Sequence, residues 1–407
     1  MVRLHAARCC AALLIFCATP AAAGEVVLDL RAALDRAAAR APEAIAARGR
    51  VGEAEATRVA ASVRFPDNLE LAVAGGPRRG AATTTDLSVE LGQRVALGGR
   101  RGARRAIADA TVAEARASAA AAVRAVELGA ALAFYRALHA ERVVDVARRG
   151  EELAARAAAV AARRRTAGDI TDLDADLARA AAGRARAAVR AAEAARAVAV
   201  GELATVVAAA PDDVLVLRGD LGAAQALTLG ALEPATAARP DLRALAAEGE
   251  VAAAERRHAD ALAWPELGLS IGYDREEDAT ILRAGLALSL PVWERGQGVR
   301  AEARARAARV AAEHEAAWRA ASRQVRDAFA AYESAREAVL AFEADVVPVL
   351  DESDALLARS VDAGTVAVAD YLVARQELLD GRREYLDRLL ALAEARVTAQ
   401  VVAGVAP

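Results

Sequence analysis

Cysteine and lysine are the first absences in this sequence. All three cysteines lie within the first 17 residues, and the sequence contains no lysine, so its cationic side chains are arginines and four histidines. Beyond residue 17 the chain therefore cannot form disulfides, bind a metal through thiolates or use a thiol nucleophile. The small formal charge of −3 also argues against a nucleic-acid-binding protein.

Bulky apolar residues and proline are scarce as well. Aromatic residues make up only 3% of the chain, and alanine dominates its apolar fraction of 56%. Few large side chains are therefore available to fill a thick core. No proline occurs between Pro77 and Pro211, and we find no run of 18 consecutive apolar residues after the N-terminal segment. These features predict thin layers of long helices and no membrane-spanning helix.

The N-terminal segment has the organisation of a secretory signal peptide. Arg3 and Arg8 form a basic region, residues 11–18 are mostly apolar, and residues 20–23 offer a small-residue cleavage site. We expect residues 1–23 to be removed on export. A lipid anchor at Cys17 is disfavoured, because bulky Phe16 stands where processing needs a small residue.

The rest of the sequence contains an internal repeat. The landmarks Ala167, Gly168, Asp174, Ala178 and Arg179 recur 196 residues later as Ala363, Gly364, Asp370, Ala374 and Arg375. Other landmarks keep nearly the same offset and order, namely Pro42 with Pro240 and Phe65-Pro66 with Trp264-Pro265. We infer two repeats, residues 24–215 and 216–407.

Each repeat contains a pair of segments in which apolar residues alternate with small or polar ones. The pair lies at about residues 67–95 in the first repeat and at about 266–291 in the second. Leu69, Leu71 and Val73 alternate with small or polar residues, and Leu267, Leu269 and Ile271 do the same in the second repeat. A period of two predicts strands with one apolar face. Residues 75–77 and 274–278 are the expected turns between the strands.

Long helical segments surround each strand pair. Helices are expected over residues 28–63 and 235–262 before the strands. After the strands we expect helices over 101–166 and 172–208 in the first repeat, and over 369–402 in the second. A helix over 101–166 would be roughly 100 Å long. Gly168 and Gly364 should break the helices at hairpin tips, and Pro348 should kink the helix that contains it. Apolar residues at spacings of three, four and seven indicate coiled coils.

Strands with one apolar face and open edges suit a membrane, provided that every edge is paired. Three chains with four strands each would close a barrel of twelve strands, an even number as in bacterial outer-membrane barrels. Phe65, Trp264 and Trp293 flank the strands and are candidates for an interfacial aromatic belt. The predicted fold is mainly α with a small β part: a coiled-coil α-helical barrel joined to a trimeric twelve-stranded transmembrane β-barrel.

The chain resembles the outer-membrane factor (TolC-like) family of efflux proteins over essentially all residues after the signal peptide. The motifs that carry the resemblance are Leu-Gly-Gly-Arg-Arg at 97–101, Arg-Pro-Asp-Leu at 239–242 and Leu-Pro-Val-Trp at 290–293. Residues 294–298 and the compact length look most like the cobalt–zinc–cadmium efflux branch.

The resemblance implies a passive export duct in the outer membrane of a Gram-negative bacterium, with a large periplasmic portion. It implies a homotrimer embedded in outer-membrane lipid that binds a periplasmic membrane-fusion adaptor and an inner-membrane resistance–nodulation–division pump. The hairpin tips at Gly168 and Gly364 would dock these partners. Asp370 matches the family's gating aspartate, and Asp174 is its counterpart in the first repeat.

This sequence departs from the family at the gate. Val373 replaces a second family aspartate, and Val361 and Val366 replace the tyrosine and arginine that lock the closed state elsewhere. Both gate candidates also have a purely structural interpretation. An acid in the first turn favours the helix dipole, and Asp174 forms a capping-box pattern with Thr171.

Other functions have less support. A spectrin-like rod or a periplasmic adaptor would explain the long helices but not four amphipathic strands. Gly296, Gly298 and Ala301 match a dinucleotide-binding pattern, but a long helix follows instead of a βαβ unit. His139, His258 and His314 are isolated, so neither a metal site nor a cofactor is expected. We find no catalytic constellation and expect no enzyme.

Overall fold

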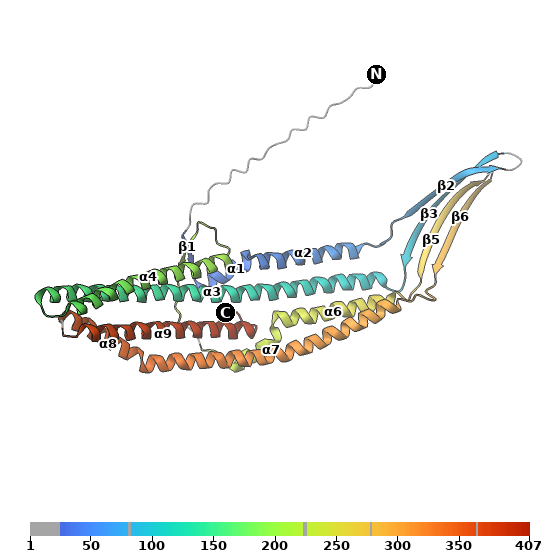
Figure 1. The fold of residues 1–407 in the computed structure, drawn as a ribbon. Coiled ribbons are helices and arrows are strands. Elements are labelled where there is room, and N and C mark those ends of the chain that lie inside the picture. Colours follow the sequence, from blue (N-terminus) through green and yellow to red (C-terminus); the bar gives the residue numbers. More distant parts are fainter. Residues whose placement is uncertain (1–24, 80–82, 223–225, 277–278, 364) are drawn as a thin grey trace, which may run out of the picture.

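The computed structural model describes residues 25–79, 83–222, 226–276, 279–363 and 365–407. The predicted signal peptide and the predicted tip residue Gly364 lie outside the described residues. The molecule is elongated, with long helices lying side by side and a sheet projecting from one end (Figure 1).

The chain passes from the helices into the sheet and back twice. β1 (Glu25–Leu28), α1 (Leu30–Arg40) and α2 (Pro42–Ser62) lead to β2 (Glu70–Arg79) and β3 (Thr83–Ala96), and α3 (Arg100–Ala167) and α4 (Asp172–Val206) follow. β4 (Val214–Leu217), α5 (Leu229–Ala235), the 3-10 turn η1 (Thr236–Ala238) and α6 (Pro240–Ala261) then lead to β5 (Glu266–Glu276) and β6 (Ala279–Ser289). The chain ends with α7 (Gln297–Asp345), α8 (Val347–Ala363) and α9 (Val368–Val402).

Proline decides where several helices break. The helices expected over residues 28–63 and 235–262 are not continuous, because Pro42 and Pro240 each begin a new helix. The preceding residues, Ala41 and Arg239, have extended ψ angles of 138° and 130°, since a following proline disfavours the helical conformation. The predicted break at Pro348 is confirmed, because α7 ends at Asp345 and α8 begins at Val347.

α3 runs unbroken for 68 residues, as the long proline-free segment predicted. One 18-residue window of α3 has a mean hydropathy of 1.4, so by length and composition alone α3 could cross a membrane. The sequence-based expectation of no membrane-spanning helix used a different criterion, an uninterrupted run of 18 apolar residues. A mean over the window can be high although charged residues interrupt the run. α3 packs along α2, α4, α6 and α9, which is the expected role of a central structural helix.

The main sheet is antiparallel, with strand order β2-β3-β5-β6. Its strands match the predicted segments, but both expected turns are wrong in part: residues 274–276 of the turn expected at 274–278 belong to β5, and the turn expected at 75–77 is a strand. Gly75, Gly76 and Pro77 continue β2 and pair with Leu87, Asp86 and Thr85. Proline is tolerated here because β2 is an edge strand.

The four predicted strands form the main sheet, but two further short strands were missed. β1 and β4 pair in parallel, with Val26 opposite Leu215. Each has four residues, and their partners lie far apart in the sequence. A local pattern therefore could not reveal the pairing.

The largest buried side chains gather where β1 and β4 meet the helices. Phe134 and Leu138 of α3 pack with Leu203 of α4, Leu215 of β4 and Val397 of α9. Towards the α3–α4 tip the interface consists of alanines, including Ala154, Ala182 and Ala185. Small side chains let the helix backbones approach closely, which suits a thin wall.

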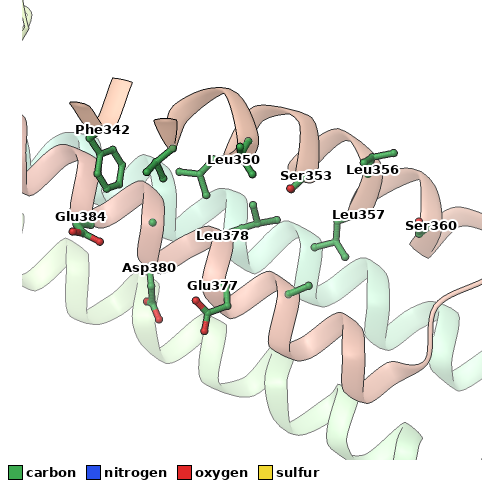
Figure 2. A pocket seen from close by; sticks show the side chains of 14 residues that line it. Phe342, Leu350, Ser353, Leu356, Leu357, Ser360, Glu377, Leu378, Asp380 and Glu384 are labelled. Atoms are coloured by element: carbon green, nitrogen blue, oxygen red, sulfur yellow. The ribbon is translucent and has the colours of Figure 1, made fainter. Parts of the chain in front are cut away.

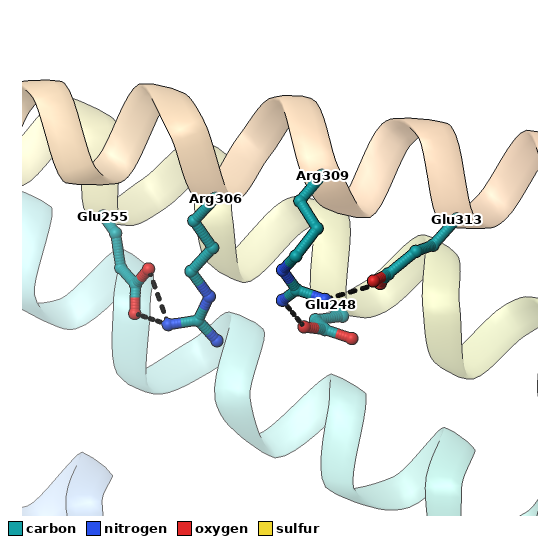
Figure 3. Close-up of polar contacts among 5 residues, drawn as sticks. All are labelled: Glu248, Glu255, Arg306, Arg309 and Glu313. Atoms are coloured by element: carbon teal, nitrogen blue, oxygen red, sulfur yellow. Dashed lines mark hydrogen bonds and ion pairs between the residues drawn. The ribbon is translucent and has the colours of Figure 1, made fainter.

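Charged pairs line the helices nearer the sheet. Arg306 of α7 donates to Glu255 of α6 at 2.8 Å, and Arg309 donates to Glu248 at 3.0 Å (Figure 3). Between α2 and α3, Arg116 donates to Glu55 at 2.7 Å. Each exposed pair contributes little stability, but together the pairs favour one alignment of neighbouring helices.

The joint between the sheet and the helices is organised by Arg100. Its guanidinium donates to the backbone carbonyls of Ala261, Leu262 and Trp264 at 3.2, 3.2 and 2.7 Å, and it pairs with the Glu266 carboxylate. Ala261 and Leu262 are the last residue and the C-cap of α6, where a helix leaves acceptors unsatisfied, and Trp264 lies in the connection to β5. Arg100 therefore ties the start of α3 to the connection between α6 and β5.

Two consecutive glycines before α3 provide a matched test of this joint. Gly98 and Gly99 have φ angles of +70° and +76°, but only at Gly98 would a Cβ overlap another group, the Trp264 side chain. Both Gly→Ala changes should cost about 1–2 kcal/mol through the left-handed backbone. Gly98→Ala should cost clearly more, as measured by thermal unfolding. Equal melting temperatures for the two variants would show that the contact with Trp264 does not constrain the joint.

Candidate functional site

The register of the main sheet sorts its side chains onto two different faces. Residues opposite each other on neighbouring strands share a face, so the pairing of Leu71 with Leu91 and of Leu91 with Ile271 aligns the apolar positions. The apolar face consists of Leu71, Val73, Leu87, Val89, Leu91, Leu267, Leu269, Ile271, Tyr273, Leu282, Leu286 and Leu288. Most of these side chains are well exposed. A face this large needs an apolar environment.

The opposite face, which we call the polar face, carries the charges. Arg78 of β2 bonds to Asp86 of β3 at 2.8 Å and to Glu276 of β5 at 2.9 Å. Arg283 of β6 pairs with Asp274 of β5 at 2.6 Å. These ion pairs link neighbouring strands, and small residues occupy much of the remaining surface. Ile281 is the one large apolar residue of this face within the described strands.

The sheet is open at both edges, because no described strand pairs with the outer side of β2 or of β6. An edge strand exposes unpaired backbone groups, and such groups cost several kcal/mol each in a hydrocarbon environment. The main sheet thus combines an exposed apolar face with two edges that the described strands leave unpaired.

The predicted interfacial aromatics lie where helices meet strands. Phe65 and Trp264 are about half exposed, and Trp293 is 88% exposed. Arg64 lies over the Phe65 ring at 5.7 Å. All three aromatics are at the end of the sheet that faces the helices. Their role at a membrane interface stays a prediction.

The far end of the helices contains the predicted tips and gate residues. Gly168 ends α3 with a φ of +84°, and its N–H bonds to Arg164 and Arg165 carbonyls, as expected for a glycine C-cap. Asp174 takes part in a complete capping box: the Thr171 N–H donates to Asp174 Oδ2 at 3.2 Å, and the Asp174 N–H donates to Thr171 Oγ1 at 3.1 Å. The structure thus commits the Asp174 carboxylate to the helix cap.

Asp370 is exposed in the first turn of α9. Neither its gating role nor that of Asp174 is decided by these contacts, and both stay predictions. The residues that do fix α9 follow it. Tyr371 donates to the Leu153 carbonyl of α3 at 3.0 Å, and Arg375 donates to the Gly150 carbonyl at 2.8 Å through Nη2.

Tyr371 and Arg375 are only 3% and 7% exposed. Burial raises the pKa of Tyr371 and lowers the pKa of Arg375. A Cβ on Gly150 would come within 2.8 Å of Leu379, so glycine permits the close approach of α3 and α9. We call Gly150, Leu153, Tyr371 and Arg375 the α9 clasp.

Sequence reasoning missed the α9 clasp. Arg375 was noted only as the repeat counterpart of Arg179, and nothing in the sequence marks one as buried and the other as exposed. Arg179 instead pairs with Asp176 on the surface of α4 at 3.0 Å. Val361 and Val366, the positions compared above with the residues that lock the closed state in the family, do not belong to the α9 clasp. Val366 lines a small apolar pocket with Tyr371, and the Val361 side chain lies outside the described residues.

A groove of about 660 Å³ runs between α8 and α9 (Figure 2). Leu350, Leu356 and Leu357 of α8 provide its apolar wall, and Glu377 and Asp380 of α9 provide acidic groups. In the part of the chain that the structure describes, no group of three or more histidine, cysteine, aspartate or glutamate residues could hold a metal ion.

Comparisons with known proteins agree with this architecture. The family model described as outer membrane efflux protein matches residues 231–405. No curated protein matches the chain. The resemblance found in the sequence is therefore supported at the level of the outer membrane efflux protein family, and the cobalt–zinc–cadmium branch is not confirmed.

Solved structures share the fold over almost the whole chain. A membrane protein from Pseudomonas aeruginosa is 20% identical, with a TM-score of 0.75, and the match covers 92% of this chain and 90% of that one. The CmeC outer membrane channel of Campylobacter jejuni is 14% identical, with a TM-score of 0.72 and coverage of 92% and 85%. The MtrE outer membrane channel of Neisseria gonorrhoeae, in its open state, is 18% identical, with a TM-score of 0.72 and coverage of 93% and 89%.

The α9 clasp predicts different effects for the two repeat-related arginines. Arg375→Ala removes charge-assisted hydrogen bonds, worth about 1.5–3 kcal/mol, and should accelerate amide hydrogen exchange in the first turns of α9. Arg179→Ala removes only an exposed pair, worth at most about 1 kcal/mol, and should leave exchange in α4 nearly unchanged. Unchanged exchange in α9 of Arg375→Ala would contradict the clasp.

Proposed function

We propose that the chain is the outer-membrane channel subunit of a tripartite efflux system, acting as a passive export duct rather than as an enzyme. The observation that carries this proposal is the main sheet, whose strand register gathers the leucines on one face and leaves both edges unpaired. Three copies would pair these edges and close a twelve-stranded barrel, with the apolar face towards lipid and the polar face towards water.

The helices would then extend into the periplasm, since they all leave the sheet from one end (Figure 1). The internal repeat is part of this proposal, and the ion pairs support it. Arg116 and Glu55 are 61 residues apart, as are Arg309 and Glu248. A spacing of 51 residues likewise occurs both for Arg58 with Asp109 and for Arg306 with Glu255.

The free end of the helices is the proposed docking region for a periplasmic adaptor and an inner-membrane pump of the resistance–nodulation–division type. The tips near residues 168 and 364 lie at this end. The groove between α8 and α9 adds an apolar wall with acidic groups that a partner helix could contact. The alternative is a periplasmic adaptor or a coiled-coil rod. Neither explains the exposed apolar face of the sheet.

Heavy-metal cations are the proposed cargo class. This finer proposal rests on the resemblance of residues 294–298 to the cobalt–zinc–cadmium branch. Tolerance to these three cations, compared between strains with and without the chain, is its test. Unchanged tolerance would reject the metal cargo and leave the proposed duct in place.

The first prediction of the proposed function concerns location and assembly. The protein should fractionate with outer membranes and run on gels as a trimer that dissociates on heating, because the strand edges are satisfied only in the closed barrel. The measurement is membrane fractionation followed by unheated and heated electrophoresis. A monomer that stays soluble without detergent would contradict the channel proposal and favour the coiled-coil rod.

A second prediction concerns Asp370 as a gate residue. Three copies around the channel axis would bring three carboxylates to the periplasmic opening, so Asp370→Ala should weaken block by divalent cations and raise closed-state conductance in planar bilayers. Asp172→Ala, an acid in the first turn of α4, is the matched control and should leave both quantities unchanged. Identical block in Asp370→Ala and the parent protein would remove Asp370 from the gate.

A further inference from the structure

The apolar face of the sheet ends in a rim of hydrogen-bond donors at the end farthest from the helices. We call these residues the outer rim: Arg79, Thr83, Thr85, Arg275 and Thr280, all exposed. The register places them on the same face as the leucines, because Arg275 pairs with Leu87 and Thr280, and Arg79 pairs with Thr83.

The charges of the two faces differ sharply at this end. Within the described strands the face that bears the outer rim carries two arginines and no acid, whereas the acids, such as Asp86, Asp274 and Glu276, lie on the polar face. The polar-face arginines are engaged, with Arg283 bound to Asp274. Among the described residues, neither Arg79 nor Arg275 has an ion-pair partner. Within the described residues, the outer rim is therefore a positive surface without a neutralising acid on its own face.

The height of the outer rim matches the level of lipid headgroups. From Leu267 to Arg275 the apolar face of β5 extends over eight residue-to-residue steps, about 26 Å along the strand at about 3.3 Å per step. A strand tilt of about 40° reduces this to roughly 20 Å along the membrane normal, near the apolar band of about 25 Å that outer-membrane barrels show. Trp264 and Trp293 lie at the opposite end of this band.

We propose that the outer rim binds phosphate groups of anionic lipids in the outer leaflet, with Arg275 as the principal ligand and Arg79 as the second. This inference rests on the proposed function, which puts the apolar face in lipid and the helices in the periplasm. A guanidinium presents paired donors that fit phosphate oxygens, and the threonine hydroxyls of the outer rim can donate further hydrogen bonds. Zwitterionic lipid offers the same phosphate together with a compensating cation, so anionic lipid binds more tightly.

The test uses the full-length protein as the purified trimer. Diphosphoryl lipid A and phosphatidylcholine are added separately, and bound lipid is measured by native mass spectrometry together with the heat-dissociation temperature of the trimer. Lipid A should bind more tightly than phosphatidylcholine and raise the dissociation temperature. Arg275→Gln should weaken lipid A binding about fivefold, and the double change with Arg79→Gln about twenty-five-fold.

Arg94→Gln is the matched control, because Arg94 lies on the neighbouring strand but on the polar face, paired with Glu70 at 3.5 Å. It removes the same charge and should leave lipid binding unchanged. Equal binding by Arg275→Gln and the parent protein would overturn the inference, as would an equal stabilisation of the trimer by inorganic phosphate. A soluble monomer would contradict the proposed function itself, whereas a stable trimer that does not discriminate between the lipids contradicts only the lipid site.

Discussion

The backbone groups at the two edges of the main sheet need hydrogen-bond partners, and this need constrains the rest of the molecule. β2 and β6 carry backbone groups that no other strand in the described part of the chain satisfies, and the apolar face between them is too large to be left in water. A second sheet packed on that face would solve only one of these problems. The proposed closure with further copies in lipid would solve both, and the alternation of side chains would then separate a lipid face from a water-filled interior.

The long helices pack mainly through small side chains, as expected for a thin layer of helices rather than a thick core. Alanine provides this, since Ala154, Ala182 and Ala185 let α3 and α4 approach closely. The large side chains are concentrated at the level of β1 and β4, where Phe134 is 1% exposed. Cross-helix pairs such as Arg306 with Glu255 replace bulky contacts nearer the sheet. Each contributes little stability, but their spacing along the helices fixes the alignment.

The sequence was sufficient for the elements whose pattern is local. The strands and the long helix α3 were predicted because period-two alternation and a proline-free run are visible in one segment. β1 and β4 were not, because a four-residue strand has no readable period and its partner lies in the other half of the chain. The breaks at Pro42 and Pro240 were readable in principle, since a proline at N1 forces an extended residue before it.

The candidate gate shows the same limit more sharply. Matching by position selected Asp370 and Asp174, and both lie at helix starts as expected. The start of α9, however, is tied to α3 by hydrogen bonds from Tyr371 and Arg375 to the carbonyls of Leu153 and Gly150. Backbone acceptors have no residue type, so no sequence pattern could have identified them.

The two hairpins differ in how their helices pack near the tip. α3 and α4 pack against each other along their length, whereas α8 is separated from α7 by the break at Pro348 and packs mainly on α9. The groove between α8 and α9 leaves part of that interface unfilled (Figure 2). Near the tip, α9 depends on the clasp made by Tyr371 and Arg375. Near the tip, the second hairpin therefore combines the clasp with a partly unfilled groove, whereas the first has a continuous alanine interface.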